Sequence, residues 1–145
     1  MEKIDLNRFV EAQKDDYQTA LGEIKSGRKK SHWMWYIFPQ IAGLGRSSTA
    51  QYYSIKNLEE AKALLEDPYL GTNLKEITAA LLGLDGNDPI AVFGHIDSMK
   101  LKSSMTIFGL VSEEGSIFQQ VLDKYYGGDK DQRTIEITSQ QSYEE

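Results

Sequence analysis

Two stretches of the chain, residues 28–47 and 97–106, concentrate side chains that could bind or transform an anion. The first surrounds an aromatic block, which contains both tryptophans, with basic, hydroxyl and amide side chains and one of the two histidines. Lysine, arginine, hydroxyl groups and glycine-opened backbone amides are the groups that bind phosphate or carboxylate in proteins. An imidazole adds proton transfer near neutral pH, so His32 is the candidate acid–base residue.

From these stretches we predict a single polar cleft that binds a small anionic ligand, phosphorylated or nucleotide-like. Basic side chains would neutralise the anion, hydroxyl groups would donate hydrogen bonds, and an indole ring would form a wall. The second stretch is expected to lie beside the glycine turn at residues 43–47. The predicted ligand-binding residues are Lys30, Trp33, Trp35, Gln40, Arg46, Ser47, Lys100, Ser103 and Ser104.

Each of these residues also has a purely structural interpretation. A lone histidine such as His32 is often a hydrogen-bonded scaffold residue, and Gln40 fits a buried backbone carbonyl as well as a ligand. The second stretch equally fits an amphipathic surface helix with incidental lysines. Two features favour function: Lys100 and Ser104 share a helix face, and Ser103 and Ser104 are poor helix formers in mid-segment.

A second functional hypothesis makes the protein an interaction module. The aromatic block would then be a partly exposed partner surface, and the basic run at residues 28–30 would steer an acidic protein. A concave pocket lined by His32, Arg46 and Ser104 favours the ligand hypothesis, whereas a flat aromatic face favours the module. Nucleic-acid binding is disfavoured, because a net charge of −6 leaves little basic surface for a phosphate backbone.

The amino-acid composition further limits the class of protein and its expected location in the cell. A chain of 145 residues, 40% hydrophobic and 26% charged, is typical of one soluble globular domain. The absence of cysteine excludes disulfides and thiolate chemistry, and two histidines far apart in sequence argue against a zinc centre. The sequence indicates no metal, cofactor or membrane partner. Because no run could span a bilayer and the amino terminus carries no apolar signal core, we expect a cytoplasmic protein.

Helical spacing and capping residues predict an all-α domain of several short helices packed around a central aromatic helix. The central segment is residues 33–38, which has no polar face and is bounded by Ser31 as a candidate N-cap and by Pro39. We predict that it is helical and largely buried.

The other helices are predicted from the same signals, with Asp5, Ser47, Asn57, Asp88 and Asp97 as candidate N-caps. The first helix is expected to break near residues 15–16. Residues 134–138 fit either a terminal helical turn or a short strand, and the single domain at 1–145 ends in a tail predicted to fray from about 139. The first predicted helix follows Asp5 and ends at residues 26–27, and the others cover residues 48–53, 58–66, 69–82, 90–93, 98–110 and 115–125.

Four runs of the sequence are distinctive: GRKKSHWMWYIFPQ at 27–40, GLGRS at 43–47, DSMKLKSSMT at 97–106 and DKYYGG at 123–128. On these runs the chain resembles, over nearly its whole length, a bacterial family catalogued as domain of unknown function 1810, whose members often carry the automatic label "calpastatin". The resemblance implies a small, mostly helical cytosolic protein and brings no established activity. The calpastatin label does not fit, because an inhibitor that folds on its target would be poor in large apolar residues.

Overall fold

A computed structural model describes residues 4–144 of the chain, with side chains from 4 to 141. Over residues 4–144 the chain forms helices and no strand, apart from an isolated bridge between Ile41 and Ile55. This confirms the all-α prediction. The helices are α1 (Asn7–Lys25), α2 (Met34–Ile37), α3 (Ser48–Tyr52), α4 (Leu58–Glu66), α5 (Pro68–Leu82), α6 (Pro89–Phe93), α7 (His95–Leu110), α8 (Ile117–Tyr126) and α9 (Gln132–Glu144).

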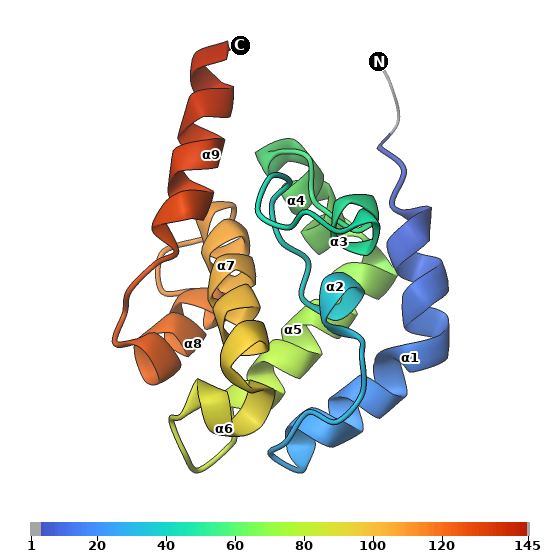
Figure 1. Ribbon diagram of the computed structural model, residues 1–145, viewed down its shortest axis with the longest axis vertical. Helices are drawn as coiled ribbons and strands as arrows, with labels where there is room; N and C mark the ends of the chain where they lie inside the picture. Colours follow the sequence, from blue (N-terminus) through green and yellow to red (C-terminus); the bar gives the residue numbers. More distant parts are fainter. Residues whose placement is uncertain (1–3, 145) are drawn as a thin grey trace.

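The helices enclose one hydrophobic core, and α5 runs through its middle (Figure 1). Helix α5 contacts α1, α4 and α8, while α7 contacts α4, α6, α8 and α9. The start of α1 and the end of α9 lie on opposite sides but toward the same end of the molecule (Figure 1). Among the described residues, no helix has both the length and the apolar composition that crossing a bilayer requires.

Short polar side chains begin several helices as the sequence predicts. The Asn57 side chain accepts a hydrogen bond from the Glu60 amide at 2.8 Å, which starts α4. The Asp88 side chain accepts a hydrogen bond from the Ile90 amide at 3.0 Å, which starts α6, and Pro89 occupies the first helical position. Each carboxylate or amide oxygen satisfies a backbone N–H that the helix cannot pair internally.

Helix α7 begins at His95, three residues earlier than the predicted start. Gly94 adopts a φ of +81°, which turns the chain out of α6 and directly into α7. Asp97 therefore lies within the first turn instead of capping the helix. Its carboxylate is engaged by two lysines, which no local capping pattern reveals.

The first and last helices also differ from the sequence prediction. Helix α1 runs unbroken through Asp15 and Asp16. At the other end, the Asp131 carboxylate accepts hydrogen bonds from the Thr134 amide at 2.9 Å and hydroxyl at 2.7 Å, so a helix follows and not a strand. Helix α9 continues through residues 139–144, and fraying of this tail stays a prediction.

The central aromatic segment is buried as predicted, but its helix is only one turn long. Trp33 and Phe38 flank α2 with 1% and 0% of their surface exposed. Trp35 differs from its neighbours because it is half-buried. Ser31 does not cap the turn, since its hydroxyl donates a hydrogen bond to Glu23 instead.

Candidate functional site

A cavity of about 450 Å³, here called the α7 cavity, lies where the start of α7 meets the α1–α2 loop. Three of the predicted site residues, His32, Trp35 and Lys100, line it together. The second histidine of the chain, His95, lines it too. The complete wall consists of Lys29, His32, Met34, Trp35, Phe93, Gly94, His95, Ile96, Asp97 and Lys100.

Asp97 is the charged centre of this wall, because both of its carboxylate oxygens face lysines. Lys29 Nζ lies 2.9 Å from Oδ2, and Lys100 Nζ lies 3.5 Å from Oδ1. Two lysines and one aspartate leave one positive charge in excess. The wall can therefore attract an anion although the chain as a whole is acidic.

The two lysines are not equivalent as ligand contacts. The Lys29 side chain is 7% exposed, and its ammonium also donates to the Ser31 carbonyl at 2.5 Å and lies 5.0 Å from the Trp33 ring centroid. Its hydrogen-bonding capacity is largely used within the protein. Among the described side chains, Lys100 has only its 3.5 Å ion pair and a cation–π contact with Trp35 at 5.1 Å, so its ammonium retains donors for a ligand.

Glu23, near the end of α1, fixes the loop that carries the aromatic block. Its carboxylate accepts hydrogen bonds from the Lys30 amide (2.7 Å), the Ser31 amide (2.9 Å), the Ser31 hydroxyl (2.6 Å) and Trp33 Nε1 (3.0 Å). Burial alone would raise the pKa of Glu23, but these four hydrogen bonds favour the charged form and lower the pKa to about 2. The loop is thereby held against α1.

A further backbone bond ties this loop to the opposite wall of the cavity. The Lys29 amide donates to the Val92 carbonyl at 2.7 Å, just before Gly94. The first turn of α7 then borders the cavity with backbone N–H groups that have no partner inside the helix. The positive end of the helix dipole adds to the field of the lysines.

The two histidines bring proton-transfer capacity to the cavity. Both residues are exposed, and within the described part of the chain neither imidazole makes a hydrogen bond. No group of three or more histidine, aspartate or glutamate side chains among the described residues is arranged to hold a metal ion. The imidazoles are therefore free to meet a ligand.

A second cavity, here called the Gly43 cavity, has a volume of about 250 Å³ and is lined by Trp35, Gln40, Gly43 and Gly45 among others. Its loop is fixed by the Ile41–Ile55 bridge, in which the Ala42 amide donates to Ile55 and the Ile55 amide to Gln40, both at 2.8 Å. Gly43 has a φ of +102°, which a side chain would strain. The sequence prediction of one cleft thus becomes two cavities that share Trp35.

Neither cavity includes the hydroxyl groups predicted from α7. The Ser103 hydroxyl donates to the Met99 carbonyl at 3.2 Å, and Ser104 is 0% exposed. The Ser104 hydroxyl has no hydrogen-bond partner among the described residues. The α7 residues that line the α7 cavity end at Lys100, and α4, α8 and α9 pack on the same helix, which corrects the predicted placement of these serines.

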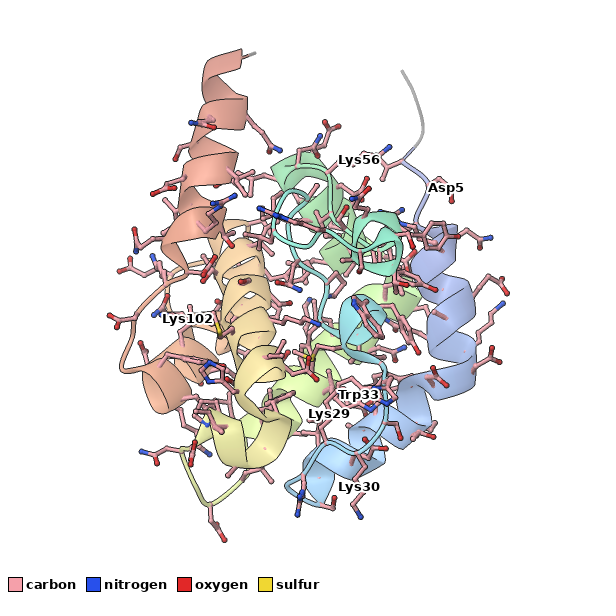
Figure 2. The ribbon with its side chains drawn as sticks, viewed as in Figure 1. Asp5, Lys29, Lys30, Trp33, Lys56 and Lys102 are labelled. Carbon is pink, nitrogen blue, oxygen red and sulfur yellow. The ribbon has the colours of Figure 1, made fainter. Side chains whose placement is uncertain are left out.

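The remaining predicted residues have other surroundings. Ser47 caps α3 by accepting from the Ala50 amide at 3.1 Å, and Arg46 is exposed and lines neither cavity. Trp33 is a core residue and not an open wall. Figure 2 shows Lys29 and Trp33 beside α1, with Lys30 at the outer edge of the molecule.

Sequence reasoning missed three residues of the α7 cavity: Lys29, His95 and Asp97. Lys29 was not distinguished from its basic neighbours, because only folding shows which lysine turns inward. Asp97 carries a capping signal that hides its ion pairs. A signal for His95 does exist, since Gly94 can open a turn that presents the next residue.

The fold and the α7 cavity define a small all-helical protein with a basic, aromatic cavity at one helix start. The chain belongs to the family described as "Protein of unknown function (DUF1810)", whose sequence profile matches residues 3–138. This confirms the resemblance noted from the sequence. The conserved hypothetical protein Rv1873 from Mycobacterium tuberculosis has a similar crystal structure, with a TM-score of 0.91 and 43% identity over 93% of this chain and 96% of that chain. A search of curated proteins gives no match.

Proposed function

We propose that this protein binds a small anionic, nucleotide-like molecule in the α7 cavity. The observation that carries the proposal is the meeting of Lys100, Trp35 and both histidines in one cavity. Lys100 would neutralise the anion, because its ammonium retains hydrogen-bond donors. A cytoplasmic location fits such a ligand and a chain without cysteine.

The apolar part of the wall supports a ligand that is more than a bare anion. Met34, Phe93 and Ile96 line the cavity beside Trp35. Ligand sites commonly combine apolar and aromatic walls with a few polar groups that fix orientation. A phosphate joined to a planar or apolar group would use both halves of this wall.

Turnover is an additional hypothesis carried by His32. Its imidazole lines the cavity and can accept or donate a proton near neutral pH. Replacing His32 with Asn should leave binding mostly intact and remove any turnover, because the amide cannot exchange protons in this pH range. Unchanged turnover in this variant would remove His32 from the mechanism.

The second candidate function is a protein-interaction module, which exposed apolar side chains beside the cavity favour. Ile96 and Met99 are 69% and 60% exposed, and Ile90 on α6 is also exposed. Exposed apolar side chains that form a contiguous patch are typical of partner surfaces. Under this hypothesis the Ile90→Ser and Met99→Ser variants, which lie outside the wall of the α7 cavity, would lose a partner and keep all ligand binding.

The test is a thermal-shift screen of phosphorylated metabolites against the native protein and two lysine variants. A ligand at about 100 times its Kd should stabilise the native state by about 2.7 kcal/mol. Lys100→Ala should weaken binding about 10- to 100-fold, as expected for a lost charge-assisted hydrogen bond. The control is Lys62→Ala, which removes an exposed lysine of α4 outside the α7 cavity. Equal shifts in both variants would contradict the proposal.

A further inference from the structure

The α7 cavity and the Gly43 cavity are neighbours because one side chain, Trp35, lines both of them. Trp35 is the half-buried residue of α2, whereas Met34 and Ile37 of the same turn are buried. Lys100 lies against its ring from the α7 side. Trp35 is therefore a shared wall of the two cavities.

The chemistry of the Gly43 cavity differs from that of its neighbour. No lysine, arginine, aspartate or glutamate is among the described residues that line it, so it favours an uncharged group. Its polar side chains include Gln40 and Gln51, and Gln51 already donates to the Arg46 carbonyl at 2.9 Å. The Gln40 carboxamide has no hydrogen-bond partner among residues 4–141.

A free carboxamide presents a donor and an acceptor side by side. This pair matches the edge of a nucleobase, where a donor and an acceptor also lie side by side. The backbone beneath Gln40 is fixed, because its carbonyl accepts from the Ile55 amide at 2.8 Å and Pro39 before it is buried. Gln40 is thus presented from a rigid segment.

The size of the two cavities agrees with a ligand that spans both. At about 250 Å³, the Gly43 cavity is smaller than the roughly 300–1,000 Å³ typical of small-molecule sites. The α7 cavity, at about 450 Å³, lies within that range by itself, and the two volumes together remain within it.

We propose that the ligand is a nucleoside phosphate whose two parts occupy the two cavities. Its phosphate binds Lys100 in the α7 cavity, and its base packs against Trp35 and hydrogen-bonds Gln40 in the Gly43 cavity. This inference rests on the proposed function, because it assigns the second half of the same ligand. It separates nucleoside phosphates from sugar phosphates and from inorganic anions.

The experiment is isothermal titration of the native protein with inorganic phosphate, ribose 5-phosphate and the common nucleoside monophosphates. At least one nucleoside monophosphate should bind about 5-fold or more tighter than ribose 5-phosphate, because its base would stack on an aromatic side chain. This comparison needs no variant and so does not depend on whether a substitution folds.

Two variants then assign the contacts. Gln40→Ala should weaken the nucleoside monophosphate about 2- to 12-fold and leave ribose 5-phosphate unchanged, because one neutral hydrogen bond is lost. Gln18→Ala, on the exposed face of α1, is the matched control and should change neither. Lys100→Ala should weaken both ligands.

The outcomes separate this inference from the proposed function. If ribose 5-phosphate and every nucleoside monophosphate bind equally, and only Lys100→Ala weakens them, the two-cavity ligand is refuted while anion binding stands. If none of the three kinds of phosphate compound binds, the proposed function fails and this inference fails with it.

Discussion

Lys29 and Lys100 contact the same carboxylate, but solvent reaches them to different extents. Lys29 is 7% exposed and has three kinds of contact, whereas Lys100 is 26% exposed and pairs at 3.5 Å. A buried ion pair is costly to break, because the remaining charge loses its compensation. An exposed pair contributes little, because water screens it.

Lys29→Ala should therefore lower the free energy of unfolding by about 2–4 kcal/mol, and Lys100→Ala by less than about 1 kcal/mol. Urea denaturation of the two variants beside the native protein measures the difference. Equal losses would show that Lys29 is not the structural member of the pair. The Lys100 variant also tests whether ligand binding can be removed without loss of the fold.

The contribution of Glu23 to the stability of the folded protein depends on pH. Its pKa in the folded protein is about 2, below the ordinary glutamate value, so the unfolded chain binds more protons as the solution is acidified. Its contribution to stability is complete above the ordinary pKa. That contribution is lost as the pH falls toward about 2.

Glu23→Gln should remove this contribution, about 1–2 kcal/mol once solvent screening of a partly exposed group is allowed for. The loss should be largest near neutral pH and should shrink between about pH 5 and pH 2. Denaturant midpoints of the variant and the native protein across this range provide the test. A constant difference would mean that Glu23 acts through shape and not through its charge.

At the scale of elements, α2 separates the roles of the two tryptophans. Trp33 lies in the core. Its replacement with Ala should lower the free energy of unfolding by about 3–5 kcal/mol, as is typical of large aromatic deletions. The sequence predicts that Trp35 is buried with the rest of residues 33–38, but it is half-buried, so its replacement with Ala should lower the free energy of unfolding clearly less. Thermal unfolding of both variants measures the order, and a larger loss at Trp35 would contradict the assignment.

Helices with local start signals were predictable, because the residues that set them are neighbours in sequence. Asn57 and Asp88 cap α4 and α6 through amides two or three residues away. The start of α7 was not predictable in this way. Asp97 carries the same capping signal, but it pairs with Lys29, which is far away along the chain. A capping pattern cannot distinguish a carboxylate that caps from one that binds a distant cation.

The site was predictable only in part, because the sequence does not show which distant segments the fold brings together. His32 and Trp35 come from one stretch and Lys100 from another, and the fold brings all three together. Ser104 shares a sequence motif with Lys100, but the helices that pack on α7 bury it. Helical spacing predicts which residues share a face, and not which turns of that face stay open.

On the scale of the whole molecule, one core joins all the major helices of the described chain. Helix α5 contacts α1, α4 and α8, and α7 links α4, α6, α8 and α9. We therefore predict a single cooperative unfolding transition. Far-UV and near-UV circular dichroism should give the same midpoint, as two-state unfolding requires. Two separate midpoints would indicate that the halves of the chain unfold independently.

The unequal burial of the two indoles gives the protein a built-in optical reporter. Trp33 is sealed in the core, whereas Trp35 meets solvent between two cavities. Emission from Trp35 should lie at longer wavelength and respond to added quenchers, while emission from Trp33 should not. A Trp33→Phe variant that folds would carry a single fluorophore at the site. Any compound that enters either cavity would then change the colour or intensity of that one signal, without a label.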